Sequence, residues 1–473
     1  MKNIKKIILG LVFVAFAFSL SAQRTGELMY FSTLPQASKY NPANHGNNKL
    51  YIEIPVLGHF GMSVNTSGFA YKDFVNQHPV YPDSLQLDFN GFADKLKDNN
   101  YVGFGMSTDL LGFGFTFDKV NHVSFNLSLN FESRFNFSKG LFDLITRGTD
   151  SQDRELDVFK DKLLDATSYL TAAFGYARDI DDKLTVGGNV KLYFGLMNIT
   201  SKKTDVTVEF DGATMATISN IDINTSNAFA NWYMKSSSSG DGATFDDVEG
   251  VPSNIFKNKG FGLDLGATYK INDAMEVSAS VIDLGWINWK SNSINVHSAN
   301  PNTRVEFAGA ETQYDNMGND LDDYFNDLAD SLKNSFDLVT TKNGGYSTAI
   351  PTKLYLGYSW NFFPNMYAQA LYKGRIIAGT LENSLTLAYT YRLGRLQASV
   401  GNTIAAKFFN PSIMVSLGDI FYCGATFASS TNLAQTSGLT TYLGFNVVFK
   451  NKKKKNLGEK LKDATSSLSL LER

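Results

Sequence analysis

The chain of 473 residues contains one cysteine and only five histidines. A single cysteine excludes internal disulfides, so stability must come from burial and hydrogen bonding. The histidines are His45, His59, His78, His122 and His297, scattered singly along the chain. This spacing matches no metal-binding motif, and we interpret them as structural or surface residues. The sequence therefore predicts neither a metal site nor a cofactor.

Catalytic motifs are also missing. The sequence has no G-x-S-x-G, H-E-x-x-H, C-x-x-C or Walker-type lysine pattern, and its glycine-rich piece at 112–114 falls inside an expected strand. We therefore expect a protein that is not an enzyme. The 43 basic and 46 acidic residues give a formal net charge of −3, which argues against a nucleic-acid partner.

Long apolar runs are absent except at the start of the chain. Three lysines precede an apolar run at 7–20, and the small residues Ser21 and Ala22 follow it. This layout predicts a signal peptide over 1–22, cleaved after Ala22 or, alternatively, after Ser21. No later run approaches the roughly 18 apolar residues of a membrane-spanning helix, which argues against a helical membrane protein.

Aromatic residues and glycine are abundant, with 37 Phe, 22 Tyr and 39 Gly. In 123–131 every odd position is Val, Phe or Leu and every even position is Ser or Asn, and 261–270 alternates in a similar way. A period of two indicates β-strands that separate two different environments. A soluble β-sandwich can alternate too, but it rarely sustains so many aromatic-rich strands in one architecture.

We therefore expect an all-β fold, a transmembrane antiparallel β-barrel of about 14 strands over 50–450. The strands are expected at roughly 50–68, 101–118, 121–137, 168–179, 183–200, 259–270, 275–290, 351–361, 366–377, 382–392, 395–405, 411–418, 420–430 and 439–450. The kinked stretches 50–68 and 101–118 are each open to division into two strands.

Short connections alternate with long ones along this series of strands. The long loops are expected at 69–100, 138–167, 201–258 and 291–350. Short periplasmic turns and long extracellular loops are typical of bacterial barrels, so both chain ends are expected in the periplasm. Within the loops, the spacing of apolar residues predicts an amphipathic helix over 319–336 and a second, more highly charged helix over 153–165, whereas 236–250 reads as a polar loop tip.

The chain ends in a basic tail, 451–473. Its lysine cluster comprises Lys450, Lys452, Lys453, Lys454 and Lys455. Lysines at this place are suited to phospholipid head groups, so we expect contact with outer-membrane lipids. A disordered, solvated tail and a periplasmic docking peptide are the alternatives.

The segment 23–49 lacks a period of two and contains Pro35 and Pro42. A barrel of about 14 strands encloses a lumen too wide for its own side chains to fill. We therefore expect 23–49 to act as a luminal hatch or plug, with Asn41, Pro42 and Ala43 as its functional element.

Asn41-Pro42-Ala43, the expected strand number, and the phrases at 260–267 and 278–285 give the chain a resemblance to a known family. It resembles the FadL-type outer-membrane transporters and their secretion-associated relative PorV, and is similar to uncharacterised outer-membrane barrels of Bacteroidota. The resemblance implies fourteen strands with a luminal hatch in the outer membrane of a Gram-negative cell. The loops 201–258 and 291–350 and the basic tail depart from the family pattern.

Two functions follow from this resemblance. The first is FadL-like uptake of hydrophobic small molecules, which requires an apolar pocket under the loops, lined by Phe and Leu from 138–167 and 291–350. The alternative is a PorV-like, non-transporting accessory subunit that docks other outer-membrane or periplasmic proteins as part of a secretion, assembly or uptake complex. A general porin ranks third, after these two functions, because the expected hatch would obstruct free diffusion.

Overall fold

The computed structural model describes residues 27–46, 48–77, 80–81, 84–147, 154–160, 162–211, 214–229, 234–235, 244–245, 254–307, 338–377, 380–405, 408–428 and 435–450. The signal peptide, the helix expected at 319–336 and Lys452 to Lys455 lie outside these residues, as does the loop tip expected at 236–250 apart from two residues. Within the described residues, no helix combines the length and apolar character needed to cross a membrane.

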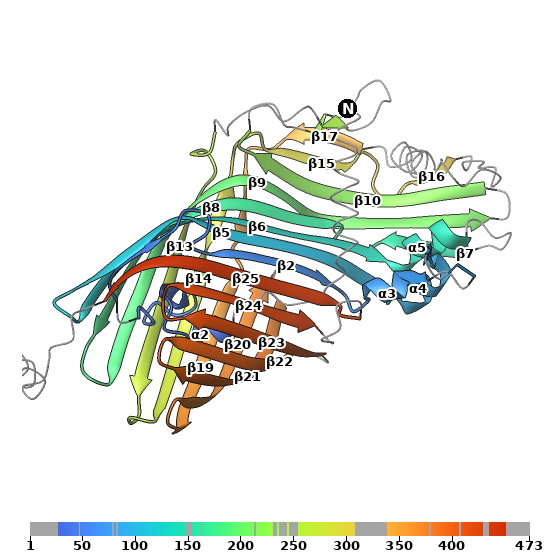
Figure 1. Cartoon of the computed structure of the whole chain (residues 1–473). Coiled ribbons are helices and arrows are strands. Elements are labelled where there is room, and N and C mark those ends of the chain that lie inside the picture. The colour runs from blue at the N-terminus through green and yellow to red at the C-terminus, as the bar shows by residue number, and fades with distance from the viewer. Residues whose placement is uncertain are drawn as a thin grey trace, which may run out of the picture.

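The described strands build one closed antiparallel barrel of fourteen strand positions (Figure 1). In ring order they are β1 (Asn48–Glu53) together with β2 (Phe60–Thr66), β5 (Asn99–Phe117), β6 (Asn121–Ser138), β8 (Leu164–Asp179), β9 (Leu184–Asp211), β13 (Lys259–Lys270), β14 (Met275–Trp289), β19 (Thr352–Phe363), β20 (Met366–Ile377), β21 (Thr380–Leu393), β22 (Leu396–Ala405), β23 (Phe408–Leu417), β24 (Phe421–Ala428) and β25 (Gly438–Lys450). β25 pairs with both β1 and β2, which closes the ring. The predicted barrel of fourteen strands is confirmed.

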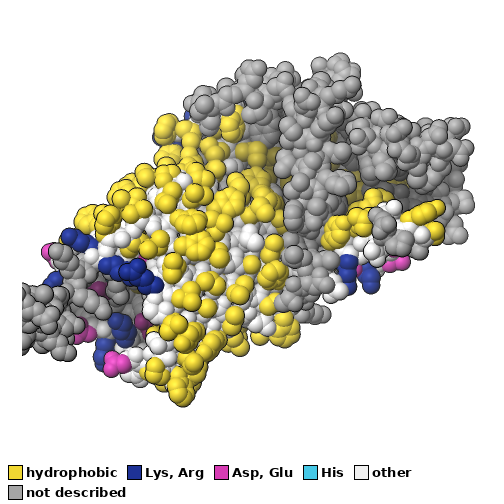
Figure 2. Space-filling model, viewed as in Figure 1, with side chains coloured by type: hydrophobic (Ala, Val, Ile, Leu, Met, Phe, Trp, Pro, Cys, Tyr) yellow, Lys and Arg dark blue, Asp and Glu magenta, His cyan; other side chains and the backbone are white. Residues whose placement is uncertain are grey.

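The wall has an apolar outer face and a polar inner face because side chains alternate along each strand. On β21, Leu385 and Leu387 are 40% and 50% exposed on the outside, whereas Thr386 and Thr390 are 1% and 0% exposed on the inside. Apolar side chains cover the visible barrel wall in Figure 2, and the charged ones lie towards the ends of the molecule. An outer face of this kind is suited to lipid.

Short turns connect the strands at one end of the barrel, which we call the turn end. Asn365, Gly394 and Gly418 have φ angles of 67°, 61° and 56°, the left-handed conformation that tight hairpins need. In the turn between β8 and β9, the backbone N–H groups of Lys183 and Leu184 donate to the Asp181 carboxylate and lower its pKa.

Strands also extend beyond the barrel at the opposite end, which we call the loop end. β9 continues to Asp211, and from Met197 onwards it pairs with β10 (Thr214–Asn227). Smaller strands add to this extension: β7 (Arg154–Phe159), β15 (Ile294–Ser298), β16 (Arg304–Phe307), β17 (Leu338–Lys342) and β18 (Tyr346–Ala349). Two short hairpins complete the strand inventory: β3 (Val75–Gln77) with β4 (Leu85–Leu87), and β11 (Met234–Lys235) with β12 (Thr244–Phe245). Segments 201–258 and 291–350 therefore contain sheet, contrary to the expectation of loops.

Three helices lie beside this extension: α3 (Tyr71–Phe74), α4 (Phe89–Lys95) and α5 (Lys139–Arg147) (Figure 1). Phe69, Phe92, Leu96 and Phe137 form an apolar cluster between them and the barrel wall. These helices lie in the segments 69–100 and 138–167, at positions other than the two that the sequence analysis predicted.

The helix expected over 153–165 is wrong. Residues 154–159 form β7, which pairs with β9, and β8 begins at Leu164. The physical reason is a period of two: Leu156 and Val158 alternate with acidic residues, and Val158 is buried against β9 and β10.

Candidate functional site: the polar lumen

Residues 27–46, which we call the luminal segment, lie inside the barrel at its turn end (Figure 1). They comprise α2 (Glu27–Tyr30), the 3-10 helix η1 (Pro35–Lys39) and a turn. Their hydrogen-bonding partners lie on walls far apart in the ring: Ser278 on β14, Arg392 on β21, Asn446 on β25 and Asp109 on β5. Only a segment within the lumen reaches all of these strands.

One side of the luminal segment is apolar. Leu28, Met29 and Leu34 are almost completely buried and pack against inward side chains of the wall, including Met414 and Tyr422. Burial of apolar side chains of this size contributes roughly 1.5–3 kcal/mol each. The segment is therefore held by packing as well as by polar contacts.

The predicted element Asn41, Pro42 and Ala43 sits against the wall formed by β9 and β13. The fully buried Asn41 side chain accepts a hydrogen bond from the Ala43 N–H at 3.0 Å and donates to the carbonyl oxygen of Ala267 at 3.2 Å. The backbone approaches closely because the wall has glycine there: a Cβ at Gly187 would lie 2.5 Å from the Pro42 carbonyl oxygen.

An ion pair joins the luminal segment to β5. Lys39 contacts Asp109, whose carboxylate is completely buried. A β-bulge lies between Asp109 and Leu111, and bulges of this kind re-aim side chains within a strand. A buried carboxylate is tolerated only when a cation and hydrogen-bond donors compensate its charge. Lys39 supplies that compensation.

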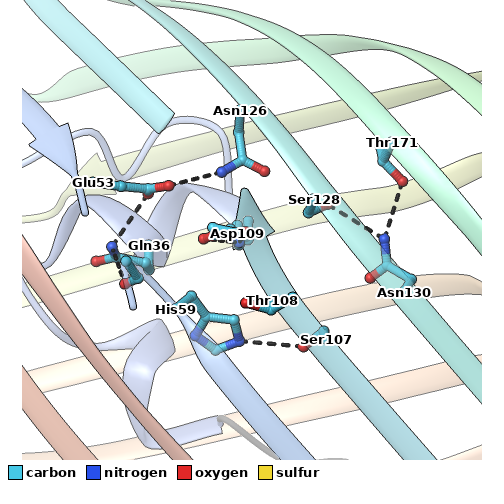
Figure 3. Close-up of polar contacts among 12 residues, drawn as sticks. Gln36, Glu53, His59, Ser107, Thr108, Asp109, Asn126, Ser128, Asn130 and Thr171 are labelled. Carbon is cyan, nitrogen blue, oxygen red and sulfur yellow. Dashed lines mark hydrogen bonds and ion pairs between the residues drawn. The ribbon is translucent and has the colours of Figure 1, made fainter. Parts of the chain in front are cut away.

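A second polar cluster surrounds Glu53 at the end of β1. Gln36 of the luminal segment donates to Glu53 Oε1 at 3.2 Å, and Asn126 donates to Glu53 Oε2 at 2.9 Å (Figure 3). Gln36 also donates to Asn446 Oδ1 at 2.7 Å. In Figure 3 these side chains point towards one another from the luminal segment, β1 and β6. Gln36 therefore bridges the first and last strands of the barrel.

His59 lies beside this cluster, directly before β2. Its Nε2 is 3.4 Å from the hydroxyl of Ser107 (Figure 3). Its Nδ1 is 2.7 Å from the hydroxyl of Tyr422. The sequence analysis did not expect a serine to meet a histidine. Nucleophilic catalysis uses a third group, usually a carboxylate, to orient the histidine. Among the described residues, a tyrosine hydroxyl takes that place, so the geometry does not assemble a catalytic triad.

A network of two lysines and two aspartates lies on the wall formed by β9, β13, β14 and β19. Lys191 contacts Asp264 at 2.8 Å and Asp283 at 2.6 Å, and Lys353 contacts Asp283 at 2.5 Å. Asp283 has a φ of 61° at a β-bulge, and its N–H donates to Asp264 Oδ1 at 2.7 Å. The bulge allows both aspartates to reach the same lysine.

Three cations gather on β19 and β20. Lys353 and Arg375 are direct partners in the strand register, and Lys373 lies two residues from Arg375 on the same inner face. Like charges placed directly opposite one another destabilise a sheet. Carboxylates from three other elements compensate them: Asp283 of β14, Glu132 of β6 and Glu27 of the luminal segment.

These groups line a cavity of about 240 Å³ next to the luminal segment, which we call the inner cavity. Its cations are Lys39, Lys191, Lys353, Lys373 and Arg375, and its acids are Glu53, Glu132, Asp264 and Asp283. The β6 wall adds the neutral hydrogen-bonding groups of Ser124, Asn126, Ser128 and Asn130. Apolar and aromatic groups such as Met62, Met106 and Tyr355 complete the lining, so the inner cavity offers charged and hydrogen-bonding groups beside apolar surface.

A second cavity of about 420 Å³, which we call the outer cavity, lies towards the loop end. It shares Glu132, Tyr169 and Arg375 with the inner cavity. Its other walls include Tyr101, Phe104, Ile350, Pro351 and Ile376, so it mixes apolar with polar groups. The lumen therefore holds two chambers that meet at three residues.

Comparison with known proteins places the chain in a family. The model of a family described as "Family of unknown function (DUF5723)" matches residues 42–425. The chain belongs to this family. No curated protein matches it in sequence.

Several solved structures are similar to this family member at low identity. The toluene transporter TbuX of Ralstonia pickettii is 13% identical, with a TM-score of 0.40 over 88% of this chain and 94% of that chain. A FadL homologue of Pseudomonas aeruginosa is 10% identical, with a TM-score of 0.41 over 91% and 97%. The toluene transporter TodX of Pseudomonas putida is 11% identical, with a TM-score of 0.37 over 91% and 95%. Similarity at this level says nothing about what this family member binds.

The histidines differ from the sequence interpretation in one respect. The rings of His45 and His122 stack with centroids 4.9 Å apart, and His45 Nε2 is 3.4 Å from Asp179. These two histidines are therefore not isolated, because the luminal segment carries His45 to the start of β6. Within the described part of the chain, no group of three or more His, Cys, Asp or Glu residues is arranged to hold a metal ion.

Three further predictions concern the lysine cluster, the segment 23–49 and the apolar pocket under the loops. Lys450 is largely exposed at the turn end and lies 3.5 Å from Asp419, and its contact with lipid head groups is untested. The plug role of 23–49 is likewise a prediction, although the contacts of 27–46 fit it. The apolar pocket expected under the loops draws in part on residues 308–337, which lie outside the described residues.

The charged lining of the lumen is what the sequence analysis missed. The signal was present at Lys191, Asp264 and Lys373, because each occupies the polar side of an alternating strand. Asp109 and Asp283 gave no such signal, since β-bulges interrupt the alternation at both positions.

Proposed function

We propose that the protein is a small-molecule uptake channel of the Gram-negative outer membrane, with the turn end and both chain termini in the periplasm. The observation that carries this proposal is the pair of cavities inside a closed barrel. A barrel with only a structural role has no need of an inner wall crowded with compensated charges, which cost folding free energy relative to apolar packing.

The expected ligand is amphipathic, with an apolar body and a polar or charged group. The sequence analysis expected FadL-like uptake of hydrophobic compounds. The charged groups of the inner cavity add the requirement that the ligand also carries a polar group. Lysine and arginine side chains of the inner cavity are suited to an anionic group, whereas Phe104, Ile350 and Ile376 offer apolar contact in the outer cavity.

Uptake into proteoliposomes tests this proposal. Octanoate is expected to enter protein-containing liposomes faster than empty ones, and Lys353→Gln is expected to slow that entry because it removes a cation from the inner cavity. Leu354→Met, on the outer face of the same strand, is the matched control and should leave entry unchanged. Toluene serves as the hydrocarbon arm of the experiment.

Two results would count against the proposal. If neither octanoate nor toluene enters faster than into empty liposomes, uptake is the wrong function. If toluene alone enters and Lys353→Gln has no effect, the ligand is a hydrocarbon and the polar cavity does not select it.

One observation favours the alternative of a PorV-like accessory subunit. The β3–β4 hairpin at the loop end exposes Val80, Tyr81 and Leu85, which are 69%, 65% and 68% exposed. Exposed apolar groups of this kind are typical of protein contacts. Purification from native membranes should then yield a stoichiometric partner that Leu85→Asp releases, and recovery of the barrel alone from both forms would exclude this role.

A further inference from the structure

Four charged residues on two walls of the lumen form reciprocal ion pairs, and we call them the bridge residues: Glu132, Arg134, Arg375 and Glu382. Arg375 Nη2 lies 3.1 Å from Glu132 Oε2, and Arg134 Nη1 lies 3.9 Å from Glu382 Oε1. Glu132 and Arg134 are two residues apart on β6, and Arg375 and Glu382 are register partners on β20 and β21. Each wall thus presents one acid and one base to the other.

These two walls face each other across the lumen. In the ring of fourteen strand positions, β6 is six positions from β20 and seven from β21. Neighbouring strands are joined by backbone hydrogen bonds, but strands at half the circumference meet only through side chains. The ion pairs therefore span the lumen from wall to wall.

The bridge residues lie at the level where the two cavities meet. Glu132 and Arg375 line both cavities, whereas Arg134 and Glu382 line only the outer one. The Arg134 guanidinium also stacks over the ring of Tyr101, 4.0 Å from its centroid, which holds it at this level. A solute that moves between the cavities along the wall that they share meets these side chains.

The two ion pairs can separate without unfolding of the barrel. All four side chains keep solvent contact, with exposed fractions between 20% and 44%. The Arg134–Glu382 pair is the more exposed one and is therefore weak and screened by salt, whereas the Arg375–Glu132 pair is partly buried and is screened less. The strands that carry them are already fixed by their neighbours, so the pairs are not needed to hold the barrel together.

We propose that the bridge residues form a barrier in the lumen, separate from the luminal segment, and that solute passage requires both ion pairs to part. The barrier sets which molecules reach the inner cavity. The proposal deepens the proposed uptake function and rests on it for its biological meaning, but the barrier itself is measurable without transport.

Cysteine accessibility tests the barrier. In a Cys423→Ser background, Ser128→Cys reports on the inner cavity and Thr167→Cys reports on the outer cavity. Each is reconstituted in liposomes and treated with 2-(trimethylammonium)ethyl methanethiosulfonate. In the glutamine variant, Glu132, Arg134, Glu382 and Arg375 are all replaced by glutamine. This removes both ion pairs and leaves the summed charge of the four positions unchanged.

Modification of Ser128→Cys is expected to become about tenfold faster in the glutamine variant. This factor corresponds to a loss of roughly 1.4 kcal/mol in the free energy that stabilises the closed barrier. Thr167→Cys is expected to react at the same rate in both forms. A charge-swapped variant with Glu132→Arg, Arg134→Glu, Arg375→Glu and Glu382→Arg retains both pairs, so its Ser128→Cys is expected to react as slowly as in the parent.

The barrier is refuted if Ser128→Cys reacts at the parent rate in the glutamine variant, or if the charge-swapped variant reacts as fast as the glutamine one. Heat-modifiable electrophoretic mobility checks that each variant is folded. If one is not, Arg134→Gln with Glu382→Gln, which leaves the Arg375–Glu132 pair intact, takes its place with the same expected direction. If accessibility changes as expected while no solute enters the liposomes, the barrier stands and the uptake function fails.

Discussion

The ion pair between Lys39 and Asp109 shows how single residues tie the luminal segment to the barrel. Asp109 is completely buried, and within the described residues Lys39 is the cation that forms an ion pair with it. Lys39→Met is expected to lower the free energy of unfolding by about 3 kcal/mol, because it leaves a buried carboxylate uncompensated. Urea unfolding in detergent, followed by tryptophan fluorescence, measures the change.

Lys39→Arg is the control for this prediction, because it keeps a cation at the same place. It is expected to unfold at nearly the urea concentration of the parent. Equal midpoints for Lys39→Met and the parent would show that other donors already satisfy Asp109.

Sequence patterning predicts side-chain direction at residues such as Asp264, which follows strict alternation, but not ion pairs such as Lys39 with Asp109. That pair depends on a β-bulge and on the path of a segment without a period of two. The partners are 70 residues apart, and no local pattern links them. Asn41, in contrast, was identified from a short motif, and the structure places it in a fully buried contact with the wall.

At the scale of elements, the luminal segment depends on glycines in the strands it touches. A Cβ at Gly187 would meet the carbonyl oxygen of Pro42 at 2.5 Å and its carbonyl carbon at 2.6 Å. Because the backbone has to move, Gly187→Ala is expected to lower the free energy of unfolding by about 1–3 kcal/mol and to make the luminal segment more mobile. Urea unfolding gives the stability, and trypsin cleavage after Lys39 reports on the segment.

Gly374→Ala on β20 is the matched control, because the nearest atoms to its Cβ are the ends of side chains at 3.3 Å or more. It should leave trypsin cleavage unchanged. If Gly187→Ala is cleaved no faster than Gly374→Ala, the close approach of Pro42 does not position the segment.

The bounds of a strand were predictable where the strand has lipid on one face and the polar lumen on the other along its whole length. Lipid on one side and a polar lumen on the other impose alternation, so β6, β13 and β21 were expected close to their observed bounds. Beyond the barrel this contrast ends. There β9 continues because Val206, Val208 and Phe210 bury one face against β7 and β10, a tertiary partnership that local patterns do not reveal.

At the scale of the whole molecule, the apolar outer face predicts a dependence on membrane depth. Leu387, midway along β21, and Leu393, beside the turn, are 50% and 58% exposed on that face. In a bilayer, Leu387→Arg is expected to lower the free energy of unfolding by roughly 2–4 kcal/mol, and Leu393→Arg by about 0–1 kcal/mol. The penalty for a charged side chain falls from the middle of the bilayer towards its interface with water. Reversible unfolding from liposomes measures both values, and equal costs would contradict a membrane-spanning orientation of β21.

The contacts of Gln36 impose an order of assembly. This residue comes early in the chain, yet its hydrogen-bonding partner Asn446 lies 410 residues later, on the strand that completes the ring. Long-range contacts of this kind form late, since the entropy of loop closure has to be overcome first. The luminal segment also contacts β5, β14 and β21, so its polar partners lie on several sides of the lumen. We therefore expect the luminal segment to reach its place before β25 pairs with β1 and β2, so that docking of the segment and closure of the ring are coupled.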